Sequence, residues 1–185
     1  PKYRASDGVL TGAEALLRWQ HPELGNISPA EFIPVAESSG LIREIDRKVL
    51  DLVIRALTQW QTSGVPLVPV AMNMSARTFQ DDTFPGLLQQ RLQQHQLPVA
   101  LLQVEITEGT LLERSNTTLA NIEKLRDMGV HLSVDDFGTG YSSLGYLKRL
   151  PLAELKIDKS FVDGLGGPDK NDESIARAIL AMAAA

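Results

Sequence analysis

Short apolar runs alternate with longer amphipathic stretches along the 185-residue chain. Runs rich in valine, isoleucine and leucine have the length and composition of buried strands. Continuous apolar strands of this kind are typical of a parallel sheet that is covered on both faces. We predict strands over Val9–Arg18, Val68–Ser75, Leu101–Thr107, Val130–Phe137 and Leu152–Asp158, and a sixth strand if residues 1–5 are extended.

Helical periodicity fills the segments between these runs. Ser28-Pro29-Ala30-Glu31 has the pattern of a capping box with proline in the first turn, which predicts a short helix that ends at Gly40. Alternating strands and helices are typical of two α/β architectures, the doubly wound open sheet and the β/α barrel. Further helices are expected over Ile42–Gln61, Phe84–Gln94 and Ser115–Met128, as a short helix from Ser143, and from Asp172 to the end.

Polar residues near the strand ends distinguish between these two architectures. In a β/α barrel the carboxyl ends of the strands converge on one face, where catalytic groups lie. We therefore predict a β/α barrel. A complete barrel takes about 250 residues, so we expect residues 1–185 to be one incomplete barrel domain. The residues near the predicted carboxyl ends are Asn73, Glu105, Asp135, Asp136 and Lys156.

Acidic residues interrupt the apolar strands. Glu14 lies in GAEALLRW and Glu105 in LLQVEITE, and a buried carboxylate without a partner costs several kcal/mol. If these two glutamates converge with Asp135 and Asp136, the four negative charges repel one another. Bound divalent cations would relieve this repulsion. With the amide oxygen of Asn73, these carboxylates form a hard oxygen donor set that suits Mg²⁺ or Mn²⁺. Two adjacent aspartates favour two ions, an arrangement that serves phosphodiester hydrolysis.

Each of these residues also has a purely structural interpretation. A single buried acid is more often bound by an arginine or a backbone amide than by a metal. Asn73 can form a turn, and Lys156 can be a solvated lysine at a sheet edge. Arg18 can pair with Glu37, whereas in the functional interpretation its guanidinium contacts a phosphate with paired donors.

Composition excludes several classes of protein. A net charge of -5 argues against binding of DNA or RNA polymers, which requires an excess of positive charge. The chain has no cysteine and three histidines, which leaves few ligands for zinc. It has neither an apolar run of membrane-spanning length nor a signal-peptide pattern at residues 1–8, so we expect a cytoplasmic protein.

Six motifs together resemble the EAL domain, the bacterial cyclic di-GMP phosphodiesterase family, over nearly the whole chain. The resemblance implies a TIM-type β/α barrel with one antiparallel strand. It also implies hydrolysis of cyclic di-GMP to linear pGpG with Mg²⁺ or Mn²⁺. The motifs, in family order, are EALLRW, HPELGNISPAEFIPVAESSGLI, NMS, VEITE, DDFGTGYSSL and LKIDKSFV.

The resemblance also assigns roles to individual residues. By motif, one metal ion has the ligands Glu14, Asn73, Glu105 and Asp135. A second ion has Asp136 as a ligand, with Asp158 close to it, and Lys156 orients the attacking water. Substrate is bound by Leu17 and Arg18 of EALLRW, with Arg18 on a phosphate. Glu108 anchors the loop DDFGTGYSS, and the helix after this loop implies a homodimer.

Two family motifs are absent from the 185 residues, and Pro1 resembles a proline inside the family's first strand, so the resemblance implies a single EAL domain that is truncated at both ends. The resemblance places a metal-ligating glutamate in an AEGVET-like motif, and a guanine-binding glutamine, after the helix from Asp172. We expect the intact parent, with or without fused GGDEF or sensory domains, to be the enzyme and the fragment to be weak or inactive. The alternative is a degenerate receptor that binds cyclic di-GMP and passes on a signal. A barrel enzyme of sugar-phosphate or enolate chemistry would not explain the loop sequence.

Overall fold

A six-stranded sheet organises the computed structural model, which describes residues 1–112, 115–138, 150–166 and 171–183. Its strand order is β1-β2-β5-β6-β7-β8. Neighbours from β2 to β8 pair in parallel, and β1 pairs with β2 in the antiparallel direction. The strands are β1 (Lys2–Tyr3), β2 (Leu10–Ala15), β5 (Val70–Asn73), β6 (Leu102–Thr107), β7 (His131–Phe137) and β8 (Glu154–Ile157).

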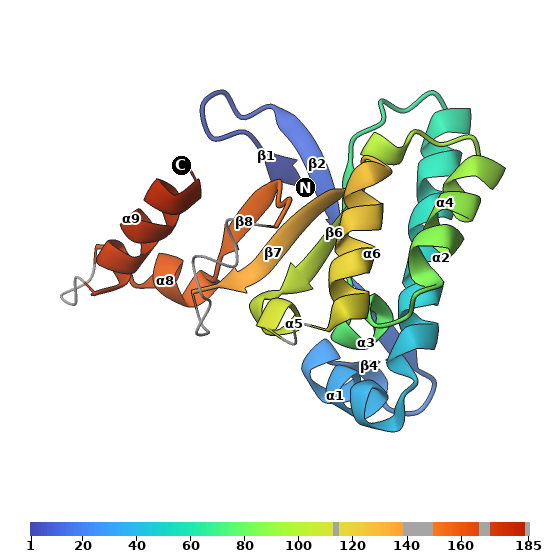
Figure 1. The fold of residues 1–185 in the computed structure, drawn as a ribbon, viewed down its shortest axis with the longest axis horizontal. Coiled ribbons are helices and arrows are strands. Elements are labelled where there is room, and N and C mark those ends of the chain that lie inside the picture. The colour runs from blue at the N-terminus through green and yellow to red at the C-terminus, as the bar shows by residue number, and fades with distance from the viewer. Residues whose placement is uncertain (113–114, 139–149, 167–170, 184–185) are drawn as a thin grey trace.

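The sheet is strongly curled. β1 and β8 stand at opposite ends of the strand order, yet the Lys2 Nζ on β1 lies 3.5 Å from the Glu154 Oε1 on β8. Such a contact requires the sheet to wrap around its inner face, as the ribbon shows (Figure 1). The result is a half-barrel with one antiparallel strand, which confirms the predicted fold class of a TIM-type β/α barrel.

Three helices cover the outer face of the sheet and pack side by side (Figure 1). They are α2 (Ile42–Thr62), α4 (Phe84–Gln94) and α6 (Asn116–Asp127). The longest, α2, has no side-chain hydrogen bond at its N-cap, so packing rather than capping stabilises it. Its buried Leu50, Ile54 and Leu57 recur at helical spacing. Burial of each contributes roughly 1.5–3 kcal/mol relative to exposure.

Shorter elements gather at the carboxyl end of the parallel strands. The hairpin of β3 (Trp19–His21) and β4 (Gly25–Ile27), with α1 (Pro29–Ser39), forms a small lobe beside α3 (Ala76–Phe79) and α5 (Glu108–Leu112) (Figure 1). The 3-10 helix Val99–Leu101 precedes β6. After β8 come α8 (Lys159–Asp163) and α9 (Asn171–Ala183), which pack against each other.

Several boundaries differ from the sequence-based expectation. β2 ends at Ala15 rather than Arg18, and the following residues enter the unpredicted β3–β4 hairpin. Ser28 caps α1 as predicted, but its hydroxyl accepts from the Ala30 amide rather than from that of Glu31. The helix predicted from Ser143 begins outside the described residues. Within the described ranges, no helix combines the length and the apolar character that a membrane span needs.

Candidate metal centre

The sheet register places four predicted ligands on one face. Glu14 pairs with Ala71, two residues before Asn73, and Asn73 pairs with Glu105. Glu105 in turn pairs with Ser133, two residues before Asp135. Because side chains alternate across a strand with a period of two, Glu14, Asn73, Glu105 and Asp135 all project from the same side.

A bulge in β7 brings both aspartates of the DDFG motif to one position on β8. Val134 pairs with Leu155 and Phe137 with Ile157, so β7 advances three residues where β8 advances two. The extra residue lets two residues oppose Lys156, an arrangement that bends the strand and redirects side chains. Asp136 has φ 53°, a left-handed conformation that aspartate tolerates better than most residues.

Three carboxylates form a compact cluster at the carboxyl end of the strands. Glu14, Glu105 and Asp135 each contribute one oxygen, and these oxygens lie within 4.8 Å of one another. The Asn73 Nδ2 donates to the Glu14 Oε1 at 3.0 Å, so the amide of Asn73 lies beside the cluster. Glu105 is fully buried. The predicted convergence of these four residues is therefore present.

Lys156 lies inside this cluster. Its Nζ donates to the Glu105 Oε2 at 2.6 Å and to the Asp135 Oδ2 at 2.7 Å, and it lies 3.7 Å from the Glu14 Oε1. Burial acts to lower the pKa of Lys156, but the hydrogen bonds and charges of Asp135 and Glu105 outweigh it and raise the pKa above its ordinary value. Lys156 is thus a permanent cation in the site, not a solvated edge lysine.

A second lysine, which sequence reasoning missed, contacts the same cluster from the opposite end of the sheet. The Lys2 Nζ donates to the Glu105 Oε1 at 2.8 Å. The three carboxylates carry three negative charges against two positive charges from Lys2 and Lys156. The cluster therefore remains net negative, which favours a cation.

Asp136 and Asp158 form a separate acidic pair next to this cluster. Burial, and then the negative charges of Asp135 and Asp158, raise the pKa of Asp136 above its ordinary value. Asp158 caps α8 by accepting from the Ser160 amide at 2.9 Å, and the hydrogen bonds from Ser160 lower its pKa. The structure thus places the predicted ligands in two groups, with Asp135 and Asp136 adjacent in the chain.

Glu108 reaches the start of the glycine-rich loop. It is buried, and its Oε2 accepts from the Gly138 amide at 3.1 Å. Gly138 has φ 101°, a conformation that side chains rarely adopt. A Cβ there would also lie 3.0 Å from the Phe161 ring. The loop's other residues, from 139 onward, and the predicted dimer helix lie outside the described residues, so the anchoring role of Glu108 stays a prediction.

A cavity of about 500 Å³ opens beside the cluster. Leu17, Arg18, Asn73 and Thr107 are among its lining residues, so it connects the EALLRW motif to the strand ends. The Arg18 side chain is exposed and donates to the Leu17 carbonyl at 2.9 Å. Glu37 lines the same cavity, but the ion pairs between described residues do not include one between Arg18 and Glu37.

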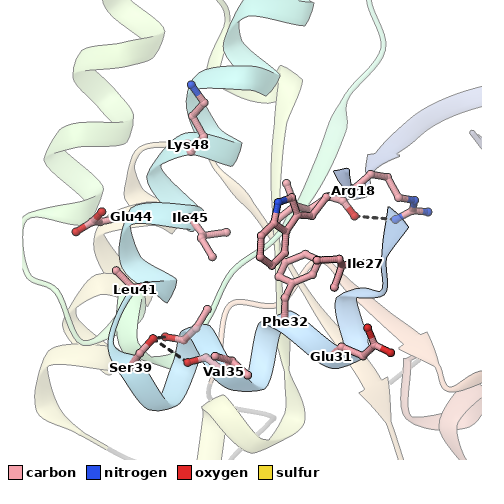
Figure 2. Close-up of a pocket in the computed structure, with 13 residues that line it drawn as sticks. Arg18, Ile27, Glu31, Phe32, Val35, Ser39, Leu41, Glu44, Ile45 and Lys48 are labelled. Carbon is pink, nitrogen blue, oxygen red and sulfur yellow. Dashed lines mark hydrogen bonds between the residues drawn. The ribbon is translucent and has the colours of Figure 1, made fainter. Parts of the chain in front are cut away.

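A larger apolar groove of about 640 Å³ lies in the lobe of α1 and the β3–β4 hairpin (Figure 2). The rings of Trp19 and Phe32 meet edge to face there, with centroids 5.5 Å apart. Figure 2 shows the Arg18 side chain directed away from Phe32 and Ile45. Leu17 and Arg18 line this groove as well, but of the two openings the smaller cavity is the one that reaches Asn73 among the predicted metal ligands.

A buried aspartate supports the segment that carries Asn73. The Asp46 Oδ2 accepts from the Ser75 amide at 3.1 Å, the Ser75 hydroxyl at 2.5 Å and the Thr78 hydroxyl at 2.6 Å. Ser75 is the N-cap of α3 and lies two residues after Asn73. Burial raises the pKa of Asp46 above its ordinary value, and the bonds from Ser75 and Thr78 partly offset this.

This raised pKa predicts a pH-dependent stability. The unfolded chain releases the Asp46 proton first, near pH 4, so stability falls as the pH rises from there to the folded-state pKa, by about 1.4 kcal/mol per pH unit. Asp46→Asn lacks this effect, and we expect it to gain stability relative to wild type between pH 4 and 7. Urea unfolding across this range measures the difference. Asp82→Asn, at an exposed position, is the control. The prediction is contradicted if the unfolding free energies of wild type and Asp46→Asn differ by the same amount at every pH.

A family model described as the EAL domain matches residues 1–185. The chain belongs to the EAL domain family. It is 43% identical over 182 residues to the bifunctional diguanylate cyclase/cyclic di-GMP phosphodiesterase MucR of Pseudomonas aeruginosa. It is 40% identical over 183 residues to the cyclic di-GMP phosphodiesterase NbdA of the same organism. These matches cover 98% and 99% of this chain but only 26% and 23% of the two relatives.

A solved EAL structure has the same fold. The PaMucR phosphodiesterase in complex with c-di-GMP matches with a TM-score of 0.88 at 43% identity, over 95% of this chain and 70% of that one. EAL phosphodiesterases are metal-dependent, and the donor set of this EAL domain fits a divalent cation, because carboxylate and amide oxygens are the ligands that such ions prefer.

Proposed function

We propose that the protein containing this EAL domain hydrolyses cyclic di-GMP to linear pGpG with Mg²⁺ or Mn²⁺. The observation that carries this proposal is the cluster of Glu14, Glu105 and Asp135, whose oxygens lie within 4.8 Å around the Lys156 ammonium. The phosphodiesterases among its relatives support the choice of reaction, and the PaMucR complex supports the choice of substrate.

Two groups of residues would hold two ions. Glu14, Asn73, Glu105 and Asp135 hold the first. The neighbouring carboxyls of Asp136 and Asp158, which interact with each other, hold the second. Bound divalent ions supply an activated water and stabilise the charge that develops on the phosphoryl group.

The remaining residues bind substrate and direct the reaction. Lys156 lies among the carboxylates and holds the attacking water in line with phosphorus. Arg18, at the exposed rim of the 500 Å³ cavity, pairs with a phosphate through its planar guanidinium. Leu17 lines the same cavity and supports the substrate by apolar contact. Glu108 anchors the DDFGTGYSS loop, and its bond to the Gly138 amide supports this role.

We also propose that this chain is part of a larger EAL domain, since it matches 70% of the PaMucR structure. The homodimer through the helix after the DDFGTGYSS loop, the fused GGDEF or sensory domains and the cytoplasmic location stay predictions. The chain matches only 26% of the MucR sequence. A parent protein as long as MucR would therefore have room for such additional domains.

Product analysis tests the proposed function directly. The full-length protein is incubated with cyclic di-GMP and Mn²⁺, and pGpG is followed by chromatography. We expect pGpG from wild type, none from Glu14→Ala, and wild-type rates from the exposed control Glu123→Ala. Tight binding of cyclic di-GMP without pGpG under either divalent ion would support the receptor alternative and end the enzyme proposal.

A further inference from the structure

Lys2 occupies the inner face of the half-barrel, on the side of Glu105 away from Lys156. Glu105 is fully buried and accepts one ammonium on each oxygen, Lys2 on Oε1 at 2.8 Å and Lys156 on Oε2 at 2.6 Å. The two lysines come from opposite ends of the strand order, β1 and β8. The carboxylate of Glu105 is therefore fixed from both sides.

Neighbouring polar side chains hold Lys2 in this position. Its Nζ also donates to the Gln103 Oε1 at 3.3 Å and to the Glu154 Oε1 at 3.5 Å. The Gln103 Nε2 donates to the Glu154 Oε2 at 2.7 Å, which closes the network. An ammonium has three donors, and three acceptors surround it here.

The backbone next to Lys2 leaves space for its long stem. Lys2 pairs with Gly12 on β2, and a Cβ at Gly12 would lie 3.0 Å from the Pro69 carbonyl oxygen and 3.8 Å from the Lys2 Cδ. A side chain at position 12 would therefore crowd the Pro69 carbonyl, whereas the Lys2 stem lies at an ordinary contact distance. The local sequence thus admits a lysine that crosses the inner face.

Geometry gives the two lysines different roles. The Lys156 ammonium contacts all three cluster carboxylates. It donates to the Glu105 Oε2 and the Asp135 Oδ2, and it lies 3.7 Å from the Glu14 Oε1. Among the three cluster carboxylates, Lys2 contacts Glu105 alone, through its Oε1; its other described acceptors, Gln103 and Glu154, lie outside the cluster. Without Lys2, a fully buried carboxylate would have one counter-ion, and its free oxygen would turn toward that ion.

We propose that Lys2 is a positioning residue for the metal centre. Its ammonium holds the Oε1 of Glu105 on the inner side, so that the Oε2 stays directed at the ion together with Glu14 and Asp135. This proposal rests on the proposed function and adds to it a residue outside the ligand motifs. Partners that orient a ligand in this way typically contribute 10- to 100-fold to metal affinity or activity.

Manganese binding to the full-length protein tests this role without reference to turnover. Titration by electron paramagnetic resonance gives the Kd for Mn²⁺ in wild type, Lys2→Met and Lys2→Arg. We expect Lys2→Met to raise the Kd about tenfold or more. Lys2→Arg, which keeps the charge and the donors, should recover most of the loss. The control Lys124→Met removes an equal charge from the exposed face of α6 and should leave the Kd unchanged.

Each outcome decides the proposal. Circular dichroism checks folding, and if Lys2→Met does not fold, Lys2→Gln replaces it with the same expected rise in Kd. A folded Lys2 variant without positive charge that binds Mn²⁺ as tightly as wild type would overturn the positioning role. So would a Lys2→Arg variant as weak as Lys2→Met. A wild-type protein that binds no Mn²⁺ and forms no pGpG would instead refute the proposed function itself.

Discussion

Glu105→Gln is expected to abolish pGpG formation, with a loss of at least about 10³-fold in kcat. Among the described carboxylates, Glu105 alone pairs with both Lys2 and Lys156. An ion that stabilises the phosphoryl charge contributes several kcal/mol, and each 1.4 kcal/mol is tenfold in rate. Glutamine keeps the shape but removes the charge that attracts the ion. Steady-state kinetics with saturating Mn²⁺ measures the loss.

The same substitution should also reduce stability. Removing one partner of a buried charge pair costs about 3–5 kcal/mol, and Glu105 is fully buried between two ammonium groups. Urea unfolding gives this value, and the exposed Glu123→Gln serves as the control for both measurements. A stable Glu105→Gln protein that retains more than a tenth of wild-type turnover would contradict the account of this residue.

Lys156→Met is expected to separate metal binding from catalysis. The Lys156 ammonium lies 2.6–3.7 Å from oxygens of all three cluster carboxylates, so its removal makes the site more negative. Mn²⁺ should therefore bind at least as tightly as in wild type. Turnover should fall by about 10²-fold or more, because a group that positions the attacking water in the transition state contributes on that scale.

The opposite pattern would refute this division of roles. If Lys156→Met weakened Mn²⁺ binding and left the kcat of the metal-saturated protein unchanged, Lys156 would be a structural counter-ion. The control is again Lys124→Met. Lys2→Met, by contrast, is expected to weaken Mn²⁺ binding. Both variants remove one positive charge beside Glu105, so a difference in Mn²⁺ affinity between them reflects where each lysine lies and not the loss of charge.

The pattern of apolar runs was sufficient to predict the order of the main elements. α4 begins and ends at the predicted residues, and each predicted parallel strand is present within its expected range. Such runs report burial, and burial determines which segments enter the sheet. The convergence of Glu14, Glu105 and Asp135 also followed from the strand ends, because parallel strands bring their carboxyl ends to one face of a barrel.

Features that depend on long-range geometry could not be predicted. The contact between Lys2 and Glu105 depends on how tightly the sheet curls and on the register of β1, which a local sequence pattern does not reveal. The β7 bulge depends on the pairing of Val134 and Phe137 with β8. The β3–β4 hairpin has strands of only three residues, which are too short for a pattern of apolar positions to indicate.

Carboxylates from separate strands of the half-barrel are expected to share a divalent ion. Crystals of the full-length protein soaked in Mn²⁺ and measured at the manganese absorption edge test it most directly. We predict an anomalous difference peak bounded by oxygens of Glu14, Glu105 and Asp135, and its loss in Glu14→Ala crystals. Ordered carboxylates in the wild-type crystals with no peak between them would contradict the account.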